Sequence, residues 1–293
     1  MAYQLKHVHG MNPLCVTVTP AMETQLGRRN LAAFIESGFD HLQLNPNPQT
    51  MRVLNRVGLS EMGFPYFGWL VAIMTAVSRV AVSFGVGLIF YGEDGEVEYG
   101  GSTETADTPG YDFDYMKRVY YEGGHDLVLD NSGLPETDLQ FFRFPDLSDS
   151  KTGLFITHWS YFENWDPYRN YLVAKEHCGL READASNDGT FTNFAQNDQS
   201  LYALHTYLMY LKFGFGRATQ DAGIEIRRGA MTREQGLNLV RLYDGHLSAD
   251  SIEDYLGYYD MSRAEFDEIL AKYANRELFA WNGTSWQPKF TVE

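Results

Sequence analysis

The sequence is poor in cysteine. Among 293 residues only Cys15 and Cys178 occur, far apart and without a Cys or His at metal-ligand spacing beside them. Disulfide frameworks and zinc sites need several such residues at close spacing. Both are therefore excluded as the basis of this fold, and a reduced, cytoplasmic setting is expected.

Positive charge is also scarce. Lys and Arg number 23 against 39 Asp and Glu, which gives a net charge of −16. Nucleic acids and anionic membranes are bound through clustered Lys and Arg. We therefore expect no nucleic-acid partner. A tRNA-modifying enzyme is disfavoured by the same charge and by the absence of a Cys-x-x-Cys pair.

No apolar run is long enough for a membrane helix. The most apolar stretch, Trp69 to Tyr91, is interrupted by Arg79, and neither part reaches the roughly 20 residues that a membrane span needs. Met1 to Gly10 contains no apolar core of a secretory signal. We expect no membrane insertion, and we interpret Trp69 to Tyr91 as a buried helix followed by a strand.

Short β-rich runs alternate with helical patterns over the first half of the chain. These runs are Leu14–Thr19, His41–Leu44, Val86–Tyr91 and Thr152–Trp159. Such alternation predicts an α/β fold with a mostly parallel sheet. We predict an α/β domain over residues 1–165 and a helical region over 166–293.

The N-terminal ten residues have the pattern of a helix end. Met1, Leu5 and Val8 fall on one face and Gly10 can cap the C-terminus, but no Ser, Thr, Asp or Asn precedes them as a start signal. Further along, Thr232 with Gln235 and Ser262 with Glu265 are capping-box signatures that predict helix starts.

A locally basic segment, Lys212 to Glu234, contrasts with the acidic whole. It holds Lys212, Arg217, Arg227, Arg228 and Arg233. This reversal suits an anionic ligand such as a nucleotide or phosphate. The alternative is a solvated helix face with ion pairs at i,i+4 spacing.

An acidic turn follows the third predicted strand. Its carboxylates are Glu93, Asp94, Glu96 and Glu98. Ligands of open α/β sheets gather at the carboxyl ends of strands, where such carboxylates could hold Mg²⁺. A charged surface turn is the alternative. A third candidate, Thr190 to Asp198, could bind a sugar or could form a helix cap and packed loop.

Several segments together resemble a known family. In the family's order and along nearly the whole chain, the sequence is similar to the N-acetyl sugar amidotransferases, the WbpG/PseA group of PP-loop (N-type) ATP pyrophosphatases. The residues that carry the resemblance are Asn12–Thr17, Leu26–Asn30, Phe39–His41, Leu88–Glu93, Glu98–Gly101, Trp165–Pro167, Gly189–Thr192 and Lys212–Arg228.

The resemblance implies an ATP-dependent enzyme of lipopolysaccharide O-antigen or flagellin-glycan (pseudaminic acid) biosynthesis. It would convert an acetamido group of a nucleotide-activated N-acetyl sugar into an acetamidino group through an adenylated intermediate. Implied cofactors are ATP and Mg²⁺. Implied partners are a HisH-like glutaminase and a HisF-like subunit that supply ammonia.

Site residues carried over by position cluster around the predicted strand ends and the basic segment. Thr17, Val18, Thr19 and Gly92 are expected near the nucleotide, and Glu93 with Glu98 near a metal. Catalytic roles are expected for Lys212, Arg217 and Glu93, and a nucleotide contact for Arg227.

The family's Cys-rich zinc segment, its first strand and its Ser-Gly-Gly-Lys-Asp-Ser loop have no counterpart here. Met1 aligns with the helix after that loop, so we expect an N-terminally truncated Rossmann-like (HUP-type) sheet. The missing strand would lie between Leu14–Thr19 and Val86–Tyr91 and leave two edges unpaired. A non-catalytic relative that binds a sugar nucleotide or a partner is the alternative function.

Overall fold

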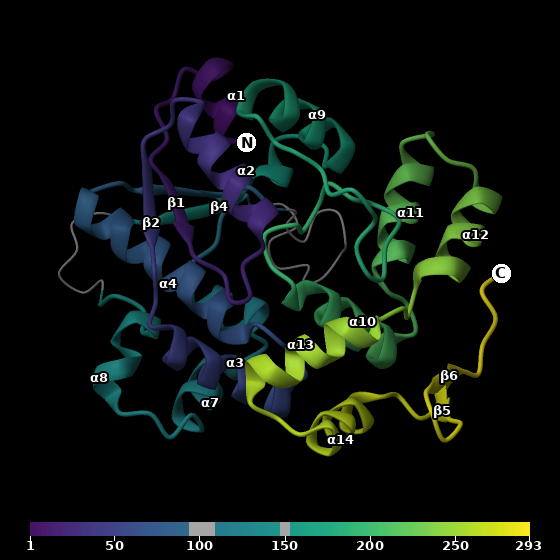
Figure 1. The fold of residues 1–293 in the computed structure, drawn as a ribbon. Coiled ribbons are helices and arrows are strands. Elements are labelled where there is room, and N and C mark those ends of the chain that lie inside the picture. Colours follow the sequence, from purple (N-terminus) through teal and green to yellow (C-terminus); the bar gives the residue numbers. More distant parts are fainter. Residues whose placement is uncertain (94–108, 147–152) are drawn as a thin grey trace. The chain divides into compact units, whose positions relative to one another are not determined.

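A computed structural model describes residues 1–93, 109–146 and 153–293 (Figure 1). The chain divides into two compact units. Unit 1 comprises Met1–Thr19, Asn30–Leu54 and Gly68–Leu180, and unit 2 comprises Pro20–Arg29, Asn55–Phe67 and Arg181–Glu293. The chain passes between them within α2 and α3 and at the start of α4. The predicted boundary at residue 165 stays a prediction.

Unit 1 is a mixed α/β structure built on two parallel strand pairs. Its elements, with α2, α3 and α4 shared with unit 2, are α1 (Ala2–His7), β1 (Cys15–Val18), α2 (Gln25–Glu36), β2 (His41–Leu44), α3 (Pro48–Met62), α4 (Phe67–Phe84), β3 (Leu88–Tyr91), α6 (Phe113–Tyr115), η2 (Met116–Tyr120), α7 (Gly124–Asp130), α8 (Glu136–Leu139), η3 (Gln140–Phe142), β4 (Phe155–His158), η4 (Trp159–Tyr161) and α9 (Pro167–Cys178).

The strands of unit 1 do not form the single sheet that the alternation predicted. Strand β1 pairs in parallel with β2, and β3 pairs in parallel with β4, as two separate sheets. Within the described residues no ladder joins β1 to β3. The α/β class and the parallel pairing are confirmed, whereas sheet continuity is interrupted between these two strands.

Helix ends in unit 1 follow the local chemistry of the sequence. Helix α1 begins after Met1 with no side-chain cap, as its missing start signal predicted. Asp166 caps α9 by accepting from the Arg169 amide, and Gly179 ends it in the left-handed conformation.

Helix α4 is the most apolar element. At 18 residues it is long and apolar enough to cross a membrane, and half of it is buried within the structure. One such helix is weak evidence for a span, because core helices pass the same test. Its side chains Val71, Ala72 and Met74 are fully buried, as the prediction of a buried helix requires.

Unit 2 is mostly helical. Buried Leu201, Leu204, Leu208 and Phe266 form much of its core, and Figure 1 shows α11 and α12 side by side. Both predicted capping boxes, at Thr232 and Ser262, are present. Besides the shared helices, the elements are α10 (Leu201–Phe213), α11 (Arg217–Arg227), α12 (Arg233–Tyr243), α13 (Ala249–Tyr259), α14 (Arg263–Tyr273), β5 (Phe279–Trp281) and β6 (Trp286–Pro288).

Candidate functional site

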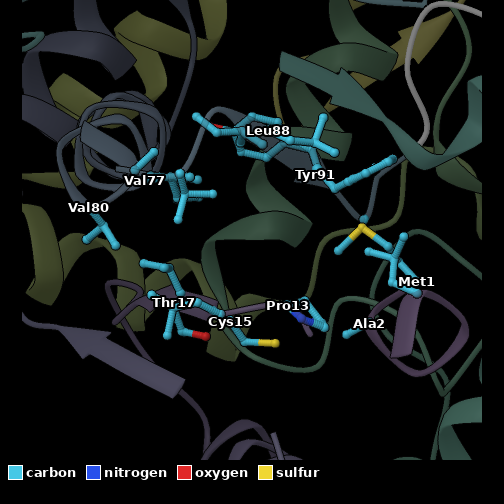
Figure 2. Close-up of a pocket in the computed structure, with 18 of the residues that line it drawn as sticks. Met1, Ala2, Pro13, Cys15, Thr17, Val77, Val80, Leu88 and Tyr91 are labelled. Carbon is cyan, nitrogen blue, oxygen red and sulfur yellow. The ribbon is translucent and has the colours of Figure 1, made fainter. Parts of the chain in front are cut away.

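A cavity of about 520 Å³ lies in unit 1 between β1 and β3. Figure 2 shows Leu88 and Tyr91 of β3 across the cavity from Cys15 and Thr17 of β1. Its wall is largely apolar, with Trp69, Ile73, Val77, Val80 and Ala81 of α4 and with Met1, Ala2 and Leu5 at the N-terminus. The cavity therefore lies between β1 and β3, where the two strand pairs are not joined.

No strand of the described residues pairs with the β1 edge that faces this cavity. The amides of Cys15 and Thr19 donate to the carbonyls of Asp40 and Leu44, at 2.8 and 2.9 Å. In a parallel ladder alternate residues bond to one neighbour, so the peptide groups of Val16 and Val18 point away from β2. Trp69 Nε1 donates to the Val18 carbonyl at 3.0 Å and satisfies one of these groups.

The β3 edge shows the same alternation. The Phe155 amide donates to the Gly87 carbonyl at 2.8 Å, which places the peptide groups of Leu88 and Phe90 on the side away from β4. Two parallel edges with free ladder positions thus flank one apolar cavity. Edges of this kind are normally paired or covered in proteins.

The N-terminus of α1 lies at the carboxyl end of β3. A Cβ placed on Gly92, the residue after β3, would lie 3.4 Å from Met1 Cε. Burial lowers the pKa of the Met1 amino group, with the Glu163 carboxylate acting in the opposite direction. The start of α1 therefore borders the strand-end region of the cavity.

The structure gathers several predicted site residues around this cavity. Thr17, Val18, Gly92 and Glu93 all line it. Thr19, one residue beyond β1, donates its hydroxyl to Asn45 Oδ1 at 2.5 Å and does not line it. Glu98, Asp94 and Glu96 lie outside the described residues. No group of three His, Cys, Asp or Glu side chains suited to a metal occurs in the part of the chain that the structure describes.

Residues that fit a nucleotide are present in part. The apolar wall fits an adenosine, and Glu93 offers a carboxylate, the ligand type that Mg²⁺ prefers. No Lys or Arg is among the described residues that line the cavity, so phosphate groups find no cationic partner on this wall. Burial raises the pKa of the Cys15 thiol to about 11, which keeps this cavity residue protonated and unreactive near neutral pH.

The predicted basic residues belong to unit 2 and have structural contacts there. Lys212 Nζ donates to the carbonyls of Met62 and Gly63, at 2.8 and 3.3 Å, and so satisfies the end of α3. Arg217 and Asp221 form a buried ion pair, with Nε and Oδ1 2.8 Å apart.

Helix α11 and the residue after it carry ion pairs, as the alternative interpretation of this segment predicts, but the i,i+4 pair is buried rather than on a solvated face. Arg217–Asp221 has i,i+4 spacing and Arg228–Glu225 has i,i+3 spacing. Arg227 is the exposed last residue of the helix. The catalytic and nucleotide-binding roles of Lys212, Arg217 and Arg227 stay predictions.

The polar segment Thr190–Asp198 also makes internal contacts. Thr190 Oγ1 donates to Asp221 Oδ2 at 2.6 Å, and Asn193 Nδ2 donates to the Ala183 carbonyl at 2.8 Å. These bonds are those of a packed loop, and sugar binding by this segment stays a prediction.

Sequence reasoning missed the side chains at the ends of β3 and β4. Tyr91 and His158 are register partners, and Tyr111 Oη lies 2.6 Å from His158 Nε2. Burial lowers the pKa of His158 to about 4, partly opposed by the backbone of Glu93. The alternation of Ile89 with Tyr91 and of Ile156 with His158 was the available signal, because it places both polar side chains on one face.

Unit 1 thus has an apolar cavity between its two parallel strand pairs. Residues 188–291, all within unit 2, match the family model described as "LPS biosynthesis protein WbpG-like, C-terminal domain". The WbpG-like resemblance is confirmed for this segment, and the match associates the chain with lipopolysaccharide biosynthesis. A comparison with curated proteins found no match.

Proposed function

We propose that the polypeptide is an ATP-dependent amidotransferase that converts the acetamido group of a nucleotide-activated sugar into an acetamidino group. The pathway would be lipopolysaccharide O-antigen or flagellin-glycan biosynthesis. The observation that carries this proposal is the WbpG-like match of residues 188–291. The parallel strand pairs of unit 1 support it, because open α/β sheets bind ligands at the carboxyl ends of their strands.

The proposed reaction balances in two steps. The acetamido oxygen attacks the α-phosphorus of ATP, and pyrophosphate leaves. Ammonia then attacks the activated carbon, and AMP departs with the former acetamido oxygen. Charge develops on the phosphates, so cationic groups and Mg²⁺ would stabilise the transition state.

The chain's own residues receive the following roles in the proposal. Thr17 and Val18, at the carboxyl end of β1, and Gly92, directly after β3, would contact the adenosine, with Thr19 beside them. Glu93, together with Glu98, would hold Mg²⁺. Lys212, Arg217 and Arg227 would supply positive charge.

The proposal also assigns a strand to the gap between β1 and β3. Two free parallel edges and an apolar cavity support this assignment, and so does the position of Met1 beside Gly92. A strand parallel to β1 and β3 would end beside Gly92 and could enter α1 through a short loop, as in a βα unit. A longer form of the polypeptide would supply this strand and a Ser-Gly-Gly-Lys-Asp-Ser loop, completing a Rossmann-like sheet.

Ammonia would come from a HisH-like glutaminase working with a HisF-like subunit, in the cytoplasm. These partners are part of the proposal because the reaction needs neutral ammonia at the activated carbon. Genes for such proteins beside this one would support the assignment.

The test has a genetic and a biochemical arm. We expect an in-frame Ser-Gly-Gly-Lys-Asp-Ser segment in the DNA upstream of Met1, and a stop codon directly before Met1 would contradict the longer form. That form, given ATP, ammonia and an N-acetylated sugar nucleotide, should release AMP and pyrophosphate and yield the amidine. Absence of both products would refute the proposed activity.

A second function is favoured by one observation. The described lining of the cavity contains no cationic side chain, and a non-catalytic subunit that binds a sugar nucleotide or a partner needs none. Such a subunit would bind sugar nucleotide without releasing pyrophosphate. Turnover of ATP by the 293-residue chain would exclude it.

A further inference from the structure

Strands β3 and β4 end at the same level, at Tyr91 and His158. The two residues are direct partners in the parallel register, so their side chains lie on the same face. Their ring centroids are 5.6 Å apart. The carboxyl ends of parallel strands are where ligands of α/β proteins sit, which makes this pair a candidate contact point.

Both residues carry a buried polar atom without a partner. Among the described residues, Tyr91 Oη and His158 Nδ1 have no partner at hydrogen-bond geometry, although the two residues are only 6% and 1% exposed. Nearly all buried polar atoms in proteins are hydrogen-bonded. Two such atoms at partnered positions therefore indicate a ligand group that the chain itself does not supply.

The hydrogen-bonding capacity of the pair follows from its neighbours. Tyr91 and Tyr111 are phenols, whose hydroxyls keep their protons near neutral pH. Tyr111 Oη and His158 Nε2 lie 2.6 Å apart, and in the tautomer in which Tyr111 donates, the imidazole proton resides on Nδ1. Tyr91 Oη and His158 Nδ1 are then two donors that await an acceptor.

The surroundings favour an uncharged acceptor. The rings of Tyr111 and Tyr120 stack on His158, at 5.6 and 5.4 Å between centroids, and provide an apolar wall. Burial of this pair, at 6% and 1% exposure, disfavours a charged group here. A carbonyl oxygen that carries a methyl group matches both the donors and the wall.

We propose that Tyr91 and His158 form an acetamido-binding pocket, in which both donate to the carbonyl oxygen and the methyl group packs on the tyrosine rings. Tyr91 also lines the cavity between β1 and β3. This inference rests on the proposed function, because it names the part of the substrate that the reaction changes.

The test compares two probes that differ only in the acetamido group, uridine diphosphate N-acetylglucosamine and uridine diphosphate glucose. We expect the 293-residue chain to bind the first at least about tenfold more tightly, since the second leaves two buried donors unpaired. Tyr91→Phe removes one donor and should reduce this preference by about tenfold. Tyr168→Phe, at an exposed position of α9, should retain it.

Equal binding of the two probes, binding of neither, or a preference that Tyr91→Phe leaves unchanged would overturn the pocket. A preference that depends on Tyr91, without AMP and pyrophosphate release by the longer form, would support the pocket and refute the proposed reaction. Release of AMP and pyrophosphate by the longer form, together with a preference that Tyr91→Phe leaves unchanged, would support the proposed reaction and refute the pocket.

If Tyr91→Phe does not fold, imidazole nitrogen NMR of the unmodified chain decides the matter. N-acetylglucosamine should shift the Nδ1 signal of His158, and glucose should not. Equal signals with both sugars would overturn the inference.

Discussion

The Arg217–Asp221 pair is the most buried ion pair that unit 2 presents among its described residues. The side chains are 12% and 6% exposed, and Thr190 also donates to Asp221. Burial raises the pKa of the Asp221 carboxyl, with Arg217 acting in the opposite direction. Removing one partner of such a pair leaves an uncompensated buried charge.

We therefore expect Asp221→Asn to lower the free energy of unfolding by about 3 kcal/mol, measured by urea denaturation. The matched control is Asp267→Asn in α14. Asp267 pairs with Arg263 at the same i,i+4 spacing, but the two side chains are 42% and 57% exposed. That change should cost less than about 0.5 kcal/mol. Equal effects would show that burial does not distinguish the pairs.

His158 should make the fold sensitive to mild acid. Its pKa is lowered from 6.5 to about 4, so the unfolded chain takes up this proton first as the pH falls. Stability is then lost as the pH falls from about 6.5 toward 4. Between pH 7 and pH 5, protonation of this group alone should lower the free energy of unfolding by about 2 kcal/mol.

Denaturation of His158→Gln at the two pH values tests this. From pH 7 to pH 5, the free energy of unfolding of the variant should fall by about 2 kcal/mol less than that of the unmodified chain. His246→Gln, at a side chain that is 61% exposed, serves as the control and should behave like the unmodified chain. An unchanged pH dependence in His158→Gln would contradict the assignment.

At the scale of elements, two helical glycines should respond oppositely to the same substitution. A Cβ on Gly58 in α3 would lie 2.4 Å from Phe67 Cβ, whereas a Cβ on Gly257 in α13 meets nothing within 4 Å. Gly58→Ala should destabilise by about 1–3 kcal/mol through overpacking. Gly257→Ala should stabilise by about 0.5–1 kcal/mol, because alanine favours helix.

Thermal or urea unfolding of the two variants measures both effects. Stabilisation by Gly58→Ala would mean that α3 and Phe67 do not pack as described. Destabilisation by Gly257→Ala would mean that the open surface of α13 is covered in solution.

Much of the element order was predictable because its causes are local. The strand runs, the apolar α4 and the capping boxes at Thr232 and Ser262 depend on residues within a few positions of each other. Contacts that join distant segments were not predictable. Examples are the hydrogen bond from Lys212 to the end of α3 and the one from Trp69 to the Val18 carbonyl. Both depend on tertiary packing, which the spacing of residues in the sequence does not encode.

The same distinction applies to the candidate site. Thr17, Val18 and Gly92 came from the family resemblance, and Glu93 also from its position after a predicted strand. All four line one cavity, and their roles stay predictions. Tyr91 and His158 were not singled out, since their meeting depends on the register of β3 with β4. A polar residue that ends a buried strand is the signal that points to such pairs.

At the scale of the whole molecule, the gap between β1 and β3 should be visible in amide hydrogen exchange. Within the part of the chain that the structure describes, the amides of Val16, Val18, Leu88 and Phe90 lie on edges without a strand partner, whereas those of Thr17 and Ile89 face β2 and β4. We expect the edge amides of the 293-residue chain to exchange much faster than the ladder amides. Equal protection would contradict the gap. In the longer form the edge amides should become protected.

The central claim is that the acetamido oxygen is adenylated and then replaced by ammonia. Its most direct test is a single turnover of the longer form with a sugar nucleotide whose acetyl carbonyl carries heavy oxygen, followed by mass spectrometry of the products. The account predicts that the heavy oxygen leaves the sugar and appears in the phosphate of AMP. Retention of the heavy oxygen in the sugar, or its appearance in pyrophosphate, would contradict the account.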